Sequence, residues 1–169
     1  MTNDKRAIVS SAHLADGAAP ALSELEFSLT LAAAAYQRWI VRCAAAAGLA
    51  LAPLEVLILH TVRHRDRAKR IADIALVLDV EDTHLITYAI RKLERAGLVA
   101  TDRSGKEKRI AATEAGRDFC LHYRDIRERV LASAVVADGP DGQALSEAAD
   151  LLRSLSGQYN QAARAAATL

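Results

Sequence analysis

The segment from residue 70 to residue 117 constrains the fold of this chain more than any other part. It reads RIADIALVLDVEDTHLITYAIRKLERAGLVATDRSGKEKRIAATEAGR. Two helical segments separated by a short polar turn come first, followed by two strand-like segments around a charged turn and the start of another helix. This order predicts a winged helix-turn-helix, a motif whose second helix enters the major groove of DNA. We therefore expect a mainly α fold with a small β-hairpin wing.

The second helix of this motif has two chemically different faces. Asp82 is placed to cap its start, because a carboxylate accepts hydrogen bonds from the free N–H groups there, and Gly97 is placed to end it. At roughly 100° per residue, one face is apolar and is expected to join the core: Leu85, Ile86, Ala89, Ile90, Leu93 and Ala96. The other face is polar and cationic: Thr83, His84, Thr87, Tyr88, Arg91 and Arg95. Base edges are read by such groups, and Arg91 is the leading candidate for a guanine contact.

The expected wing is short and strongly basic. Its strands are expected at residues 98–101 and 109–112, with Ser104 and Gly105 at the tip. Four cations crowd the tip: Arg103, Lys106, Lys108 and Arg109. Since neighbouring like charges repel, an anionic partner explains this cluster better than fold stability does. The alternative is a charged turn that is only solvated. The polar and cationic helix that precedes the wing makes this alternative the weaker interpretation.

Positive charge is concentrated around the motif, although the net charge of the chain is only +1. Residues 63–109 hold twelve Lys and Arg against eight Asp and Glu, a balance of +4, and the remaining residues balance to −3. In the basic segment that precedes the motif, we favour Lys69 and Arg70 as phosphate contacts.

Three segments resemble the multiple antibiotic resistance regulator (MarR) family of winged-helix transcription factors. They are Leu51-Ala52-Pro53-Leu54-Glu55, Leu93-Glu94-Arg95-Ala96-Gly97-Leu98-Val99 and Ala112-Thr113-Glu114-Ala115-Gly116. The resemblance covers about residues 25–135. It implies a transcriptional regulator that binds double-stranded DNA. The regulator is expected to be a repressor, and a small-molecule effector is expected to relieve the repression. Four aromatic side chains are candidates for the effector pocket, with an aromatic interface core as the alternative: Tyr36, Trp39, His60 and Tyr123.

Both ends of the chain are predicted to be helical with apolar faces larger than a small winged domain covers. For this topology we expect helix exchange in a symmetric homodimer, whose two-fold axis matches a palindromic operator. The expected organisation is a flexible N-terminal arm at 1–20, an N-terminal dimerisation helix at 21–50, the winged helix-turn-helix at 51–116 and C-terminal dimerisation helices at 117–169.

Other classes of protein find little support. Neither a glycine-rich phosphate loop nor a G-x-S-x-G elbow occurs, and His60 and His64 share a helix face without a third ligand, so we expect no enzyme, cofactor or metal site. Without a recognisable secretory or membrane-spanning segment, a cytoplasmic location is expected.

Two alternative functions stay open. A winged helix can serve as a protein–protein interaction module, although such a module has no need of cations on both helix and wing. Cys43 or Cys120 can also make the chain an oxidant-sensing regulator, but apolar helical surroundings favour a buried structural role for both.

Overall fold

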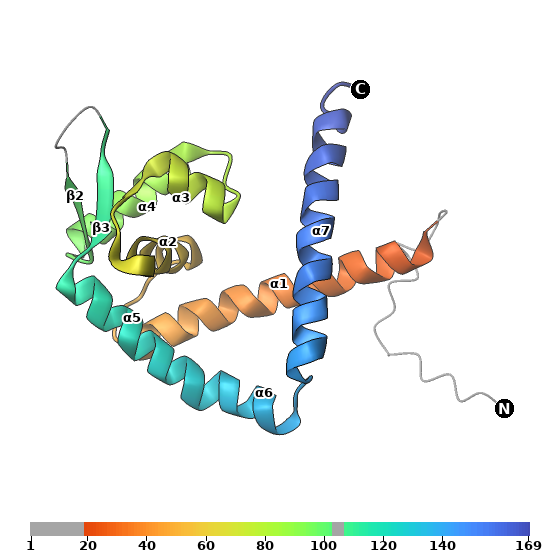
Figure 1. The fold of residues 1–169 in the computed structure, drawn as a ribbon, viewed down its shortest axis with the longest axis horizontal. Helices are drawn as coiled ribbons and strands as arrows, with labels where there is room; N and C mark the ends of the chain where they lie inside the picture. The colour runs from red at the N-terminus through yellow and green to blue at the C-terminus, as the bar shows by residue number, and fades with distance from the viewer. Residues whose placement is uncertain (1–18, 103–106) are drawn as a thin grey trace. The chain divides into compact units, whose positions relative to one another are not determined.

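The computed structural model describes residues 19–102 and 107–169 and divides into two units, with the boundary between Tyr123 and Arg124. Most of the expected N-terminal arm, and Arg103 and Lys106 of the wing tip, lie outside the described residues. The elements, seen in Figure 1, are α1 (Pro20–Ala46), α2 (Pro53–Arg63), the 3-10 turn η2 (His64–Asp66), β1 (Lys69–Arg70), α3 (Ile71–Leu78), α4 (Thr83–Arg95), β2 (Val99–Asp102), β3 (Arg109–Ala112), α5 (Glu114–Arg127), the π-helical turn η3 (Glu128–Ala132), α6 (Ser133–Asp138) and α7 (Gly142–Ala166).

The expected fold class, mainly helical with a small hairpin, is confirmed. Helices α3 and α4 form the helix-turn-helix, and β2 and β3 form the hairpin beside them (Figure 1). The sheet also contains β1, which was not predicted: the strand order is β1-β3-β2, with β3 antiparallel to both neighbours. Arg70 of β1 lies opposite Arg109 of β3. A two-residue strand is too short to show alternation of polar and apolar residues, so its pairing was invisible in the sequence.

Helix α4 buries one face against the rest of the first unit. Ile86, Ala89, Ile90 and Leu93 are buried, as predicted from their spacing. The prediction for Leu85 and Ala96 was wrong, because 53% of Leu85 is exposed and Ala96 is also exposed. Both residues lie at the edge of the apolar stripe, and burial of the centre of the stripe leaves its edges exposed.

The end of α4 and the start of α5 meet at a tight corner. Gly97 has a φ of 72°, the left-handed conformation expected of a residue that ends a helix. The Thr113 hydroxyl donates to the Gly97 carbonyl at 2.6 Å and accepts the N–H of Gly116 at 3.1 Å, which caps α5. A Cβ on Gly116 would lie 2.1 Å from the carbonyl oxygen of Leu98. Only glycine at position 116 therefore allows α5 to approach the backbone of Leu98 this closely.

A buried carboxylate joins α2 to α4. Only 3% of Glu55 is exposed, and its Oε2 accepts the backbone N–H of Ala52 at 2.9 Å, at the start of α2. Its Oε1 forms an ion pair with Nζ of Lys92 on α4, and the hydrogen bond within this pair raises the pKa of Lys92. Because a buried charge is stable only with partners, this arrangement fixes α4 against α2.

The long helices α1 and α7 leave apolar side chains exposed. Within α1, the buried residues are Ile40, Cys43 and Ala44, all near its C-terminal end. The large apolar side chains of α1 that are at least 40% exposed are Leu22, Leu31, Tyr36 and Val41. In α7, which begins at a cap formed by Asp141 and the N–H of Ala144 at 2.8 Å, all described residues are at least partly exposed. None of the described helices is long and apolar enough to cross a membrane.

Replacing Gly116 with alanine should lower the free energy of unfolding by about 1–3 kcal/mol, because the new Cβ overlaps the Leu98 carbonyl oxygen. The matched control is Gly157→Ala on α7, where an added Cβ meets no described atom within 4 Å and should stabilise the helix by up to about 1 kcal/mol. Urea denaturation followed by far-UV circular dichroism measures both changes. An unfolding free energy of Gly116→Ala equal to that of the wild type would contradict the close packing of this corner.

Replacing Glu55 with alanine should lower the free energy of unfolding by about 1–3 kcal/mol, because the hydrogen bonds to Ala52 and Lys92 are both lost at a buried position. Glu55→Gln should lose less, since its amide oxygen still accepts the N–H of Ala52. The same denaturation experiment compares the two variants. If both lose equal stability, the cap at the start of α2 contributes nothing.

Candidate nucleic-acid interface

The face of α4 that points away from the core is the first part of the candidate interface. Thr83, His84, Tyr88, Arg91 and Arg95 are exposed on it, and Thr87 is half-buried. The helix begins as expected, because Oδ1 of Asp82 accepts the N–H of His84 at 2.8 Å. A capped start holds the first turn of α4 in place, and residues near the start of such a helix are the ones that approach base edges.

The polar groups on this face differ in how far the protein itself uses them. The Thr87 hydroxyl donates to the Thr83 carbonyl at 2.9 Å, and Nε of Arg95 donates to the Arg91 carbonyl at 3.2 Å. Nζ of Lys92 lies 5.9 Å from the centre of the Tyr88 ring. The Arg91 guanidinium makes no hydrogen bond or ion pair with any residue that the structure describes. Arg91 is therefore the cation of this face most available to a partner.

The wing supplies the second part. Lys108 and Arg109 are exposed at the start of β3, and neither side chain forms a hydrogen bond or ion pair inside the described ranges. Their side chains are therefore not engaged by the described residues, and their contact with an anionic partner stays a prediction.

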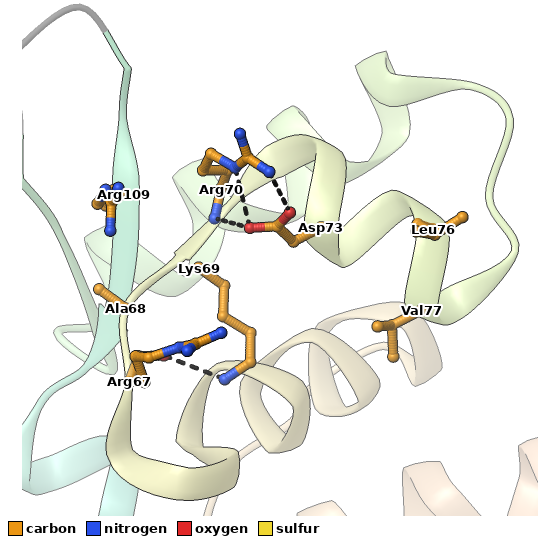
Figure 2. Close-up of a pocket in the computed structure, with 8 residues that line it drawn as sticks. All are labelled: Arg67, Ala68, Lys69, Arg70, Asp73, Leu76, Val77 and Arg109. Atoms are coloured by element: carbon orange, nitrogen blue, oxygen red, sulfur yellow. Dashed lines mark hydrogen bonds and ion pairs between the residues drawn. The ribbon is translucent and has the colours of Figure 1, made fainter.

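A groove runs between β3 and α3, and Figure 2 shows the side chains that line it: Arg67, Ala68, Lys69, Arg70, Asp73, Leu76, Val77 and Arg109. Arg70 and Asp73 form a closed pair at one side of this groove. Nη2 of Arg70 lies 2.8 Å from Oδ1 of Asp73, and Nε of Arg70 donates to Oδ2 at 3.1 Å. These hydrogen bonds lower the pKa of Asp73 to about 2. Nη1 of Arg70 also lies 3.5 Å from Oε2 of Glu107, on the segment leading into β3.

Lys69 is likewise engaged by the protein. Its Nζ donates to the carbonyl oxygens of His64 at 2.7 Å and Arg67 at 3.0 Å. Burial, and then the charge of Arg67, lower the pKa of Lys69. The polar ends of both expected phosphate contacts, Lys69 and Arg70, thus serve the local structure of β1 and α3.

Arg67 is a groove residue that was not among the expected phosphate contacts. Its guanidinium forms no hydrogen bond or ion pair with a described residue, and it lines the groove together with Lys69. The signal for it was present, because residues two apart in an extended segment point to the same side.

The four candidate effector residues divide into a pair and two separate side chains. His60 on α2 and Tyr123 on α5 pack edge to face, with ring centres 5.0 Å apart and planes at 69°. On α1, the Tyr36 ring is 55% exposed and Trp39 is half-buried. The structure therefore places His60 and Tyr123 in contact between α2 and α5. Tyr36 and Trp39 lie on α1, the helix expected to dimerise.

Both cysteines are buried, in agreement with a structural role. Sγ of Cys43 donates to the Tyr123 carbonyl at 3.6 Å. Burial raises the pKa of the Cys120 thiol to about 11, which disfavours the reactive thiolate that an oxidant sensor requires. Over the described parts of the chain, His, Cys, Asp and Glu side chains nowhere gather into a group of three able to hold a metal ion.

Known proteins share the fold that carries this candidate interface. The sequence profile of a winged helix DNA-binding domain family matches residues 51–116. A MarR-family transcriptional regulator from Rhodococcus sp. has a similar structure, with 22% sequence identity, a TM-score of 0.62 and coverage of 78% of this chain and 91% of that chain. A mutant MarR from E. coli, solved in complex with operator DNA, is similar with 13% identity, a TM-score of 0.67 and coverage of 83% and 99%.

CouR from Rhodococcus jostii, solved with bound p-coumaroyl-CoA, is also similar, with 21% identity, a TM-score of 0.61 and coverage of 78% of this chain and 90% of that chain. No curated protein sequence matches the chain. At these identities the solved structures establish the fold alone. Residues 51–116 match the family of winged helix DNA-binding domains, and the chain has the fold of the MarR-family transcriptional regulators.

Proposed function

We propose that this chain is a homodimeric, sequence-specific transcriptional regulator, most simply a repressor, that binds double-stranded DNA through α4 and the wing. The observation that carries this proposal is the outer face of α4, where Arg91, unpaired among the described residues, stands beside the exposed polar side chains of Thr83, His84 and Tyr88. Arg91 is the proposed guanine contact, because its planar guanidinium matches the two acceptors of guanine in the major groove. Thr83, His84 and Thr87 lie near the start of α4 and are proposed to contact base edges or phosphates.

The remaining cations are proposed to act on the phosphate backbone. Tyr88 and Arg95 support the contacts of α4, while Lys108, Arg109 and the other wing cations, Arg103 and Lys106, approach the minor groove or the backbone. Lys69 and Arg70 enter the proposal as positive charges that also position β1 and α3. Phosphate contacts of this kind set affinity and orientation, whereas Arg91 sets sequence preference.

A homodimer is supported by apolar surface that the single chain leaves uncovered. Leu31 and Tyr36 on α1 and Leu145 and Leu151 on α7 are each between 46% and 55% exposed. Exposed apolar side chains on two long helices are typical of a subunit interface. A two-fold symmetric dimer would carry two copies of α4 to successive major grooves, about one helical turn apart, on a palindromic operator.

Control by a small molecule is the finer part of the proposal. The similar protein CouR was solved with p-coumaroyl-CoA. In this chain the His60–Tyr123 pair, together with Tyr36 and Trp39, is the proposed border of an effector pocket. Any such ligand acts only if it binds one arrangement of the two DNA-binding lobes more tightly than the other.

A protein-binding winged helix is the second candidate. It is favoured by apolar side chains on the helix-turn-helix, since 82% of Leu76 and 65% of Val77 on α3, and 53% of Leu85 on α4, are exposed. A module of this type would show no sequence preference among DNA duplexes, so the experiments below also distinguish the two candidates.

The Arg91→Ala variant should weaken binding to the preferred operator by about 1–3 kcal/mol and relax the sequence preference, because a bidentate base contact is lost. Fluorescence anisotropy with the operator and a scrambled duplex measures both effects. Arg164→Ala, at an exposed position near the end of α7, is the matched control and should bind as the wild type does. Unchanged binding of both duplexes by Arg91→Ala would remove this residue from the interface.

The Lys108→Ala variant should weaken binding to all duplexes alike and reduce the dependence of log K on log salt by about one unit of slope. The physical reason is that one fewer counterion is released when one phosphate contact is lost. Titrations at several salt concentrations give the slope. A slope equal to that of the wild type would place β3 away from the DNA.

A further inference from the structure

A second cationic groove lies within the first unit, separate from the surface of α4 and the groove of Figure 2. It has a volume of about 580 Å³ and lies where the end of α2, the turn η2 and the first part of α5 come together. Its lining residues are His60, Arg63, His64, Arg65, Asp66 and Arg117. None of these residues belongs to the proposed contacts of α4 or the wing, and His60 is the one lining residue that also borders the proposed effector pocket.

The charges of this groove are unbalanced. Three guanidinium groups and two imidazoles face a single carboxylate, that of Asp66. Arg117 is the partnered member: its Nη1 lies 3.5 Å from Oδ1 of Asp66 and donates to the Ala112 carbonyl at 2.9 Å. The side chains of Arg63 and Arg65 make no hydrogen bond or ion pair within the described chain. Cations gathered in a concave site repel one another unless an anion lies between them.

The backbone of the turn η2, which carries three of the lining residues, has an uncommon conformation. Arg65 and Asp66 are consecutive residues with φ of 59° and 48°, in the left-handed region that side chains other than glycine rarely adopt. Lys69 supports the turn by donating to the His64 carbonyl at 2.7 Å. Strain of this kind persists where the surrounding structure enforces it, and it is concentrated at binding sites.

His60 adds a polar group without a partner. Its Nε2 is buried and forms no hydrogen bond with any described residue. Burial, followed by the charge of Arg63, lowers the pKa of this imidazole, so the neutral form is favoured. Buried polar atoms nearly always have a hydrogen-bond partner, so Nε2 of His60 is a polar group at this groove that the described residues leave unsatisfied.

We propose that this groove is a binding site for a small organic anion that carries two or more negative charges on phosphate or carboxylate groups. Arg63 and Arg65 supply the unpaired guanidinium groups that hold the anion, and Arg117 completes the site. Guanidinium groups match both kinds of anion, because each can donate two parallel hydrogen bonds to a pair of oxygens.

The site is connected to the wing through Arg117. This side chain binds the carbonyl of Ala112, the last residue of β3, and also pairs with Asp66. An anion in the groove competes with Asp66 for Arg117 and so acts on the base of the wing. This regulatory consequence rests on the proposed DNA binding, whereas the anion site itself does not.

The test is isothermal titration calorimetry of the full chain, without DNA, in low-salt buffer. The probes are inorganic pyrophosphate and citrate, which separate phosphate from carboxylate ligands. The double variant Arg63→Gln with Arg65→Asn removes both unpaired charges, and asparagine tolerates the left-handed conformation at position 65. Arg164→Gln on α7 removes one charge outside the groove as the control. Thermal unfolding of each variant establishes that it is folded.

Saturable binding of at least one probe, retained by Arg164→Gln and weakened at least about tenfold in the double variant, is the expected result. Absence of saturable binding of both probes to the wild type, or equal binding by the folded double variant, would overturn the proposal. A further outcome would overturn it in favour of DNA: neither probe binds, and the double variant loses duplex affinity with a smaller salt slope. A failure of all duplex binding leaves the calorimetric result valid, so the two proposals fail separately.

Discussion

The position of α4 depends on one buried carboxylate. One oxygen of Glu55 accepts the backbone N–H of Ala52 at the start of α2, and the other binds Lys92 of α4. The Glu55 side chain is almost completely buried. The apolar stripe of α4 determines which side of the helix faces inward. The ion pair adds a fixed point along and around the helix axis, because both oxygens of the carboxylate are used. A surface that reads DNA needs such a fixed point, since a small misplacement of its side chains breaks several contacts together.

The cations of the first unit fall into two groups, those that the protein itself binds and those that it does not. The net charge of the chain does not distinguish the two groups. Lys69, Arg70 and Lys92 are bound by carbonyl or carboxylate oxygens of the protein and hold β1, α3 and α4 in place. Arg91 and Arg109 make no such contacts with described residues. Interaction with an external anion is expected from the second group, while the first keeps the surface in shape. The groove at the end of α2 repeats this division, with Arg117 engaged and Arg63 unengaged.

Much of the fold followed from local chemistry. The Asp82 cap, the left-handed Gly97 and the helical spacing of the buried residues of α4 all depend on residues close in sequence, and each was predicted, apart from the edge positions Leu85 and Ala96. Contacts between distant residues were not predictable. Strand β1 is defined by its pairing with β3, and the buried Glu55 has Lys92, 37 positions away in the sequence, as its charged partner. For the same reason the sequence could indicate that Lys69 and Arg70 are basic, but not that their polar atoms were already in use.

The outer face of α4 and the wing are together the proposed surface for specific DNA. The most direct test is to incubate the purified chain with a pool of random duplexes at several salt concentrations and to sequence the retained molecules. If α4 and the wing bind specific DNA, a palindrome whose half-sites lie about one helical turn apart will be enriched, with retention that falls steeply as salt rises. Failure to retain or enrich any duplex, even at low salt, would contradict specific DNA binding and leave the winged helix as a surface for a protein partner.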